Sequence, residues 1–386
     1  MNSPAIRFAG FTDAWEERKL GEILRYEQPT AYIVKRTKYN DHYSTPVLTA
    51  GQSFILGHTD ETSGIKNANK NKPVIIFDDF TTSSHLVDFP FKVKSSAMKL
   101  LTLRDENDDF TFSFNSLKKI NYIPQNHERH WISKFSGFCI SIPDKIEQKK
   151  IGKMFFEIDR FVTLHQLEHD KTVNIKKALL EKLFPKDGED TPAIRFAGST
   201  GAWKQLEFGN IVTPYAAPVP TPTDGYYRLG IRSHAKGTFH SYVRPGMELG
   251  TAQMHRVAAN NFIVNITFGW EHAVAITNEN DAEKLVSHRF PQFSFNTNMV
   301  PDFFKFLIID ENFRHHLSLA SPGGAGRNRV LKIDEMLEYK FWVPFADEQR
   351  QIAMFLGHFD RLITLHQREL TKLQNIKKAL LEKMFV

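Results

Sequence analysis

The sequence predicts an α+β protein in which two globular mixed α/β domains are separated by two long antiparallel coiled-coil helices, with a pseudo-twofold internal repeat. Three observations lead to this prediction. The chain has 386 residues, which is enough for two or three domains. A segment of about 40 residues occurs twice almost unchanged, and the stretches before each copy carry strand-like patterns.

The internal repeat sets the order of the parts. PAIRFAG at 4–10 returns at 192–198, an offset of 188, and NIKKALLEK at 174–182 returns at 375–383, an offset of 201. Along 143–184, 22 of 42 positions are identical to their counterparts, which is far too many for coincidence. We therefore expect five parts, namely globular domain 1, spacer helix 1, a linker, globular domain 2 and spacer helix 2, at residues 1–142, 143–184, 185–191, 192–343 and 344–386.

Each repeated segment reads as one long helix. No proline or helix-breaking cluster interrupts Glu147 to Phe184 or Glu348 to Phe385. Apolar and polar residues at alternating spacings of three and four predict a coiled-coil seam on each helix. In the second copy the seam is Ile352, Phe355, Phe359, Leu362, His366, Glu369, Leu373, Ile376 and Leu380. In the first copy it is Ile151, Met154, Ile158, Phe161, His165, Glu168, Thr172, Ile175 and Leu179.

The direction of pairing follows from the length of the linker. Each helix is roughly 55–60 Å long at about 1.5 Å per residue. A parallel pair would require residues 185–203 to return along that whole length almost fully extended. The sequence therefore favours an antiparallel pair.

Strand patterns fill the globular parts. Short or alternating apolar runs predict β-strands within 72–80, 89–101, 138–143 and 260–268, and 303–320 predicts a helix. The linker LFPKDGEDTP at 183–192 has the proline, glycine and acidic residues of a solvated boundary.

Composition narrows the function classes. Hydrophobic residues make up 41% and charged residues 24%, which excludes wholesale disorder. No run approaches a membrane span and the start, MNSPAIRFAG, has no charged-then-apolar signal pattern, so we expect a cytoplasmic protein that makes no membrane contact. The net charge of +6 is spread over all parts, so any nucleic-acid surface must come from local patches. With Cys139 as the only cysteine, no intrachain disulfide or thiolate zinc cluster is possible.

No catalytic or metal-binding motif is recognisable, and we expect no catalytic residue, no metal site and no cofactor bound by this chain. Neither GxxxxGK[ST] nor HExxH occurs. Pro143-Asp144 with Glu147, and Pro301-Asp302 with Glu338, weakly resemble the acidic pattern of metal-dependent nucleases, but such short patterns arise by chance. His165 and His366 could bind a metal with the nearby glutamates, although a polar layer that fixes helix register is the favoured interpretation.

Candidate DNA-contacting residues lie where polar, basic and aromatic residues interrupt strands. Such side chains can bond to base edges or phosphates. In the first domain they are Thr81, Thr82, Ser83, Ser84, His85, Gln125, Asn126, Arg129, His130 and Lys134. In the second domain they are Arg232, Lys236, Asn265, Thr267, Trp270, His272, Arg327, Asn328 and Arg329.

The whole chain resembles the specificity subunit of type I restriction-modification systems. The resemblance rests on PAIRFAGFTDAWEERKLGEI at the start, the FPKDGEDTPAIRFAG linker and ITLHQRELTKLQNIKKALLEKMF at the end. It implies that each globular domain is a target recognition domain reading one half of a bipartite double-stranded DNA target. Because the two domains differ in sequence, the target should be asymmetric.

The resemblance also implies partners and cofactors. The helices would set the spacing between half-sites and dock two modification subunits, which use S-adenosylmethionine to methylate adenine. Two restriction subunits would use ATP and Mg²⁺ to translocate and cut DNA. Two alternatives compete with this scaffold function: a free-standing metal-dependent DNA nuclease, and a coiled-coil adaptor that never contacts DNA.

Overall fold

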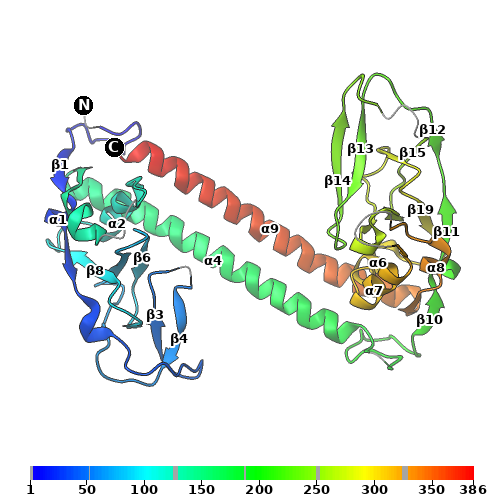
Figure 1. The fold of residues 1–386 in the computed structure, drawn as a ribbon, viewed down its shortest axis with the longest axis horizontal. Helices are drawn as coiled ribbons and strands as arrows, with labels where there is room; N and C mark the ends of the chain where they lie inside the picture. The colour runs from blue at the N-terminus through cyan, green and yellow to red at the C-terminus, as the bar shows by residue number, and fades with distance from the viewer. Residues whose placement is uncertain (1–2, 52, 125–128, 187, 249–252, 324–328) are drawn as a thin grey trace. The chain divides into compact units, whose positions relative to one another are not determined.

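The computed structural model describes residues 3–51, 53–124, 129–186, 188–248, 253–323 and 329–386. The chain divides into two compact units (Figure 1). Unit 1 comprises residues 1–168 and 366–386, and unit 2 comprises residues 169–365. Within the described ranges, no helix has the length and apolar character needed to cross a membrane. The five predicted boundaries stay predictions, because each unit combines one globular part with pieces of both long helices.

Unit 1 contains a four-stranded sheet, a three-stranded sheet and a two-stranded ribbon. The first sheet is antiparallel and has the order β2 (Leu24–Glu27), β8 (Met98–Leu103), β5 (Val74–Asp78), β6 (Ser84–Val87). In the second sheet β3 (Thr45–Leu48) lies between antiparallel β4 (Ile55–Thr59) and parallel β7 (Lys92–Val93). The ribbon pairs β1 (Glu16–Lys19) with β9 (Cys139–Ile142), which leads directly into the first long helix.

Unit 2 repeats this topology with two further strands, β12 (Pro218–Val219) and β15 (Met254–Arg256), in its second sheet, although its sequence has diverged. Its four-stranded sheet has the order β11 (Val212–Tyr215), β19 (Gln292–Phe295), β16 (Asn261–Val264), β17 (Val274–Ile276). Its five-stranded sheet has the order β12, β15, β18 (Leu285–Ser287), β13 (Tyr226–Ile231), β14 (Thr238–Val243). Its ribbon pairs β10 (Lys204–Glu207) with β20 (Lys340–Val343). In both units the first strand of the four-stranded sheet, β2 or β11, lies at one edge. The next two strands form a hairpin at the other side, and the last strand, β8 or β19, lies between the first strand and this hairpin.

The short helices lie between these strands. In unit 1 they are α1 (Leu20–Ile23), η1 (Pro29–Tyr32), α2 (Phe110–Lys119), α3 (His130–Ser133) and η2 (Phe135–Gly137). In unit 2 they are α5 (Phe208–Ile211), η3 (Gly269–Glu271), α6 (Pro301–Leu307), α7 (Glu311–Leu319) and α8 (Ile333–Leu337). The strand predictions are confirmed by β5, β7, β8, β9 and β16.

The single helix predicted over 303–320 is wrong. Two helices, α6 and α7, occupy this stretch. The Asp310 carboxylate accepts hydrogen bonds from the backbone N–H groups of Asn312 and Phe313, and so caps a new helix. This capping outweighs the continuous apolar pattern that predicted one helix.

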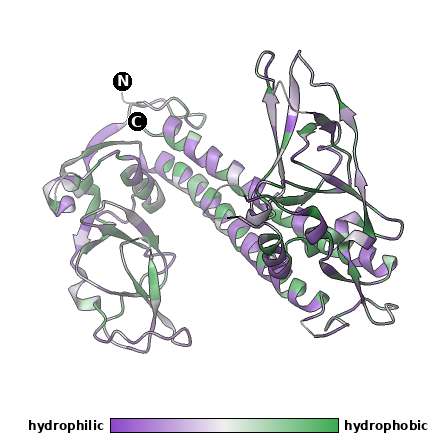
Figure 2. Cartoon of the chain, turned by 45° about the vertical axis from the view of Figure 1, so that its right-hand side comes forward, coloured by the Kyte–Doolittle hydropathy of each residue, from purple (hydrophilic) through white to green (hydrophobic). Residues whose placement is uncertain are grey.

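The two long helices are α4 (Lys145–Leu183) and α9 (Ala346–Met384), as predicted from the repeat. Hydrophilic and hydrophobic residues alternate along both (Figure 2). Within unit 1 the beginning of α4 lies against the end of α9, because the rings of Phe155 and Phe385 meet edge to face at 5.4 Å. Within unit 2 the end of α4 joins the core that contains the beginning of α9, with Leu183 and Ile352 both buried. The helical segments in each unit are therefore antiparallel.

The predicted coiled-coil seam is only half right. Its shared positions, seven residues apart from Ile151 and Ile352, are buried or half-buried. The inward positions that alternate with them lie four residues after a shared position, at Phe155, Val162, Leu356 and Leu370. The predicted seam places the corresponding positions three residues after a shared position. At about 100° per residue, a step of four ends about 40° from the starting face and a step of three about 60° away, so the fourth residue faces inward more fully. Five predicted seam residues are consequently exposed, namely Phe161, Ile175, Phe355, Leu362 and Ile376.

Two cross-helix ion pairs follow from this shifted seam. In unit 1 Lys377 donates to Asp159, and in unit 2 Lys176 donates to Asp360. The two pairs are equivalent under the offset of 201 residues. The lysines occupy inner positions, where they are half-buried, and each finds a carboxylate on the facing helix. The internal repeat therefore extends from sequence to individual side-chain contacts.

A buried glutamate anchors the beginning of each long helix. Arg7 of the first PAIRFAG segment donates from Nε and Nη2 to the two carboxylate oxygens of Glu147, at 2.9 and 2.7 Å. Arg195 of the second segment binds Glu348 in the same way, at 2.9 and 2.6 Å. These bonds raise the pKa of both arginines above the ordinary value. Since the Glu147 side chain is fully buried, Arg7 compensates a charge that water cannot reach.

The glutamine that follows each of these glutamates fixes the beginning of a short helix, α2 in unit 1 and α6 in unit 2. Gln148 donates to the Pro143 carbonyl at 3.0 Å and accepts from the backbone N–H of Asp109, the cap of α2, at 3.2 Å. Gln349 makes the same two kinds of bond, to the Pro344 carbonyl and from the N–H of Val300 before α6. The Pro…Glu-Gln pattern thus joins the PAIRFAG segment, the short helix and the beginning of the long helix in each unit.

The PAIRFAG segments also hold the opposite helix ends. The Ile6 N–H donates to the Lys383 carbonyl at the end of α9, and the Ile194 N–H donates to the Lys182 carbonyl at the end of α4, both at 3.0 Å. The phenylalanine directly after each long helix packs into a domain core. Phe385, after α9, stacks on Phe112, and Phe184, after α4, stacks on Phe303. Each globular part is therefore built around the start of one long helix and the end of the other.

We expect Arg7→Met to lower the free energy of unfolding by about 3 kcal/mol, because it leaves the buried Glu147 carboxylate without its counter-ion. Urea unfolding followed by circular dichroism measures this loss. Arg36→Met is the matched control, since Arg36 and Asp60 form an exposed pair at 4.0 Å worth at most about 1 kcal/mol. Equal losses in the two variants would contradict the anchoring role.

Candidate nucleic-acid interface

Three connections in each unit bring most of the predicted DNA-contacting residues together. In unit 1 they are the β3–β4 turn, the β5–β6 turn and the α2–α3 connection; in unit 2 they are the β13–β14 turn, the β16–β17 turn and the α7–α8 connection. We call these six segments the site loops. They occupy matching topological places, because β5–β6 and β16–β17 end corresponding sheets and β3–β4 and β13–β14 each adjoin one parallel strand. Only the β3–β4 turn contains no residue that the sequence predicted as a DNA contact, since its short run Thr49–Ser53 carries no basic residue.

The β5–β6 turn of unit 1 is held by an acidic side chain. Asp78 accepts from the Phe80 N–H at 2.8 Å and from the Thr81 hydroxyl at 2.7 Å. Thr82 adopts a left-handed conformation with φ of 60°. Ser83 donates to the Ala50 carbonyl at 3.0 Å and so connects this turn to the β3–β4 turn. The backbone of the predicted Thr-Ser cluster is thus fixed by its own hydroxyls.

Ser84 and His85 continue this cluster into β6. The His85 ring stacks on Phe54 beside the β3–β4 turn, with ring centres 4.4 Å apart. Burial, together with the positive charge of Lys118, lowers the pKa of His85. His85 therefore presents a neutral ring near the loops at neutral pH.

The second predicted cluster of unit 1 joins the first through Asp79. The Asp79 carboxylate accepts from the Trp131 N–H at 3.0 Å and from Lys99 Nζ at 2.9 Å. The Asp79 carbonyl also lies 2.7 Å from His130 Nδ1. Lys99 and Asp79 are both buried, which makes this a paired interior charge.

The prediction that His130 contacts DNA needs correction. Its side chain is buried and its Nδ1 is bonded to the Asp79 carbonyl, so it joins α3 to the β5–β6 turn in the interior. Arg129 and Lys134 on either side are exposed and stay predicted contacts. Gln125 and Asn126 lie outside the described residues.

In unit 2 two site loops are joined by backbone hydrogen bonds. The N–H groups of His234 and Ala235 donate to the carbonyls of Glu271 and His272, at 2.9 and 2.8 Å. Both donors have positive φ, which gives the β13–β14 turn its tight curve. Arg232 and Lys236 are exposed on this turn.

The β16–β17 turn is shaped by Asn265. Its Oδ1 accepts from the N–H and the hydroxyl of Thr267, at 3.1 and 2.7 Å. Trp270 follows on the same turn, and the guanidinium of Arg329 lies 5.5 Å from its ring centre. Predicted residues from the β16–β17 turn and the α7–α8 connection thus lie together, although Arg327 and Asn328 lie outside the described residues.

The prediction that His272 contacts DNA also needs correction. Its side chain is buried, and Nε2 lies 2.6 Å from the Ile308 carbonyl. Because a carbonyl can only accept, Nε2 carries the proton. Burial lowers the pKa of His272, so the ring is neutral in the fold. His272 supports the turn and does not reach the surface that carries Arg232.

A hollow of about 320 Å³ opens beside these loops in unit 2. Phe239 and Phe268 line it and are each close to half exposed. Glu271 on its wall accepts a hydrogen bond from Ser233 at 2.5 Å. The region therefore offers aromatic, basic and acidic groups within one surface.

Three of the four acidic residues considered for a nuclease, Asp144, Glu147 and Asp302, have structural partners. Asp144 caps α4 by accepting from the Ile146 and Glu147 N–H groups, and Glu147 binds Arg7. Asp302 pairs with Lys305 on its own helix. Among the described residues, no group of three His, Cys, Asp or Glu side chains is placed to hold a metal ion.

The two seam histidines do come together. His165 Nδ1 and His366 Nδ1 lie 3.2 Å apart within unit 1, as expected for a polar layer between α4 and α9. The two residues are equivalent in the repeat, so the contact joins like positions of the two helices.

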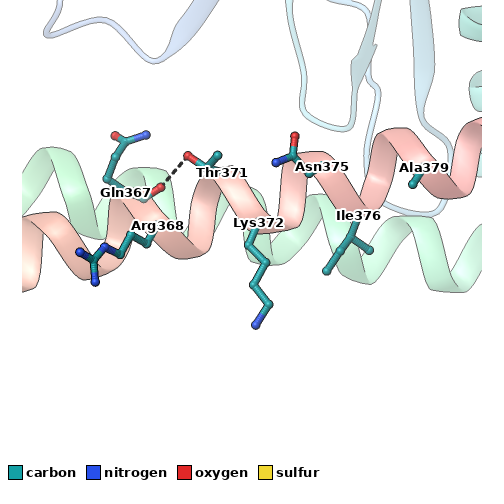
Figure 3. A pocket seen from close by; sticks show the side chains of 7 residues that line it. All are labelled: Gln367, Arg368, Thr371, Lys372, Asn375, Ile376 and Ala379. Carbon is teal, nitrogen blue, oxygen red and sulfur yellow. Dashed lines mark hydrogen bonds between the residues drawn. The ribbon is translucent and has the colours of Figure 1, made fainter. Parts of the chain in front are cut away.

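A shallow groove of about 600 Å³ runs along the exposed side of α9 in unit 1 (Figure 3). Its lining residues are Gln367, Arg368, Thr371, Lys372, Asn375, Ile376 and Ala379. Five of the seven are identical in α4, at Gln166, Lys171, Asn174, Ile175 and Ala178, and all of these are exposed. The repeat therefore preserves an outward-facing surface as well as the packed one.

Comparison with known proteins gives a family match over most of the chain. The Type I restriction modification DNA specificity domain matches residues 12–174 and 233–375. The two matched segments correspond to the two halves of the internal repeat.

Two curated relatives and one solved structure agree with this match. A stretch of 127 residues is 51% identical to the specificity subunit of the type I restriction enzyme EcoR124I/EcoR124II from Escherichia coli, covering 32% of this chain and 31% of that protein. The MjaVIII specificity subunit of Methanocaldococcus jannaschii is 20% identical over 95% of this chain and 91% of its own length. The S subunit of a type I restriction-modification system from M. genitalium has the same fold, with a TM-score of 0.68, 15% identity and coverage of 100% and 99% of the two chains.

We expect the stability of the protein to fall as the pH drops from about 7.5 to about 5.5, because the unfolded chain takes up a proton at His272 that the folded protein resists. The folded pKa lies below 6.5, so this contribution is complete above that pH and is lost below it. The slope from one such group is at most about 1.4 kcal/mol per pH unit.

Urea unfolding across this pH range measures the slope. His272→Gln keeps a donor for Ile308 without titrating and should flatten the dependence. His234→Gln is the matched control, since His234 is exposed and has the same φ of 61°. An unchanged slope in His272→Gln would count against this assignment.

Proposed function

The chain belongs to the type I restriction modification DNA specificity family, and we propose that each of its units reads one half of an asymmetric bipartite target in double-stranded DNA. DNA sequence recognition is the role of this family. The observation that carries the proposal is the pair of matching site-loop sets. They occupy equivalent places in the two units, yet their sequences differ.

The differences in the loops support asymmetry of the target. Unit 1 offers the hydroxyls of Thr81, Ser83 and Ser84, which can bond to bases or phosphates, together with the exposed side chains of Arg129 and Lys134. Unit 2 offers Arg232, Lys236 and Arg329, which bring positive charge and the bidentate geometry of arginine. Two surfaces of such different chemistry favour different base sequences.

The outward faces of α4 and α9 support docking of two modification subunits, one on each helix. Ile175 and Ile376 were expected in the seam but are exposed, at 41% and 40%. Exposed isoleucines at repeated positions, each surrounded by identical residues, suit one kind of partner bound twice. The helices would also set the distance between the two half-sites.

The chemistry belongs to the partners in this proposal. Specificity subunits of this family are in general non-catalytic. Modification subunits would supply S-adenosylmethionine-dependent adenine methylation, and two restriction subunits would use ATP and Mg²⁺. The nuclease alternative gains no support, because Asp302 and Glu147 are each engaged by a cation of the same unit.

Exchange of residues 1–142 for those of a family member with another target should change one half-site and leave the other intact, because the loops of unit 1 all lie in this segment. Sequencing of methylated adenines in cells that express the hybrid with its modification subunit measures this. An unchanged target would refute recognition by unit 1. Purified chain with Mg²⁺ alone should neither cut nor methylate DNA, and cleavage lost in Asp302→Ala would instead support the nuclease.

Ile376→Asp should remove one of two bound modification subunits, and Ile175→Asp/Ile376→Asp should remove both, because a carboxylate on the apolar groove floor opposes burial. Native mass spectrometry counts the bound subunits. Met354→Asp is the control, since Met354 is 73% exposed on α9 outside the groove. Full occupancy in the double variant would place the docking surface elsewhere.

A further inference from the structure

Two arginines in the site loops of unit 2 are stacked on aromatic rings. The guanidinium carbon of Arg232 lies 5.3 Å from the ring centre of Phe239, and that of Arg329 lies 5.5 Å from the ring centre of Trp270. Both distances are within the range of a cation–π interaction. In the described part of the chain, these are the arginines that stack on aromatic side chains, and both belong to the predicted interface.

The Arg232 arrangement is built by the β-hairpin itself. Gly230 and Phe239 are direct partners in the β13–β14 ladder. A Cβ atom at Gly230 would lie 2.3 Å from the Phe239 ring, so the ring lies across the backbone where a side chain is missing. Arg232, two residues further along, rests on this ring and also donates from Nη1 to the Thr238 carbonyl.

Stacking holds the guanidinium plane without using all of its donors. With Nη1 bonded to Thr238, the edge formed by Nε and Nη2 can still donate two parallel hydrogen bonds. Guanine presents two acceptors, O6 and N7, at the matching separation in the major groove. An arginine that is already oriented loses less side-chain entropy on binding, which strengthens this contact.

Unit 1 presents a different surface at the equivalent loops. There the stacked partner of an aromatic ring is His85 on Phe54, and the burial that lowers its pKa favours the neutral form. The neighbouring groups are the hydroxyls of Thr81 and Ser83. A neutral ring and hydroxyls do not select guanine as a fixed arginine fork does.

We propose that Arg232 and Arg329 each read a guanine in the half-site bound by unit 2, with Phe239 and Trp270 as positioning residues. This inference rests on the proposed function, since it assigns the bases that one set of site loops selects. It deepens that function by requiring at least two guanines, on either strand, in the half-site that stays constant when residues 1–142 are exchanged.

The first test compares methylated targets in cells that express the modification subunit with wild-type chain or with single variants. Arg232→Lys and Arg329→Lys keep the charge but lose the planar fork, so each should make one guanine position degenerate while the other half-site stays intact. Phe239→Leu should weaken the same position as Arg232→Lys. Lys236→Gln, on the same turn, should lower overall methylation and leave the target sequence unchanged.

The second test removes the acceptor from the DNA and does not depend on the folding of a variant. The wild-type complex with its modification subunit is titrated with duplexes in which one guanine of the half-site is 7-deazaguanine, which lacks N7. Affinity should fall, within the range of about 5- to 150-fold for a complete bidentate contact. The same replacement should cost the corresponding lysine variant no further affinity.

The outcomes separate the two levels of the argument. A unit 2 half-site without guanine, lysine variants with an unaltered target, or full affinity for every 7-deazaguanine duplex would overturn the arginine assignment and leave bipartite recognition standing. A target that does not respond to exchange of either globular part would overturn the proposed function itself.

Discussion

A buried carboxylate at the beginning of each long helix is the interaction on which the other contacts depend. Glu147 and Glu348 are almost completely enclosed, and an interior charge requires a partner of opposite sign. The PAIRFAG segments supply that partner as Arg7 and Arg195, each in a two-bond arrangement. The same segments bond through their isoleucine N–H groups to the ends of the antiparallel helices. One short motif therefore joins a helix start, a helix end and a globular part.

This framework lets the loops vary without disturbing the fold. Gln148 and Gln349 fix the short helices beside each sheet, and the two four-stranded sheets have the same strand order. The site loops are stabilised by their own contacts, through Asp79 in unit 1 and Asn265 in unit 2. Such local support permits hydroxyls together with Arg129 and Lys134 in one unit, and arginines stacked on aromatic rings in the other. The modest net charge of +6 agrees with recognition through local patches.

The long helices combine two surfaces that the sequence pattern alone does not separate. The inner surface follows positions four residues apart from the shared seam and includes the His165–His366 contact and two ion pairs. The outer surface keeps Ile175 and Ile376 exposed, although their spacing also suits a seam. An exposed isoleucine costs little alone, but its repetition within identical neighbours supports the docking surface proposed above.

The repeat, the two long helices, several strands and the clusters from which the site loops are made could all be predicted from the amino-acid sequence. These features rest on local pattern and self-similarity, which are visible without a structure. The inward face of each helix depends on packing, because steps of three and four differ by only about 100° around the axis. The break of the predicted 303–320 helix rests on the local cap at Asp310, whereas the burial of His130 and His272 depends on partners distant in sequence. The stacking of Arg232 on Phe239 likewise depended on strand register at Gly230, which no local pattern reveals.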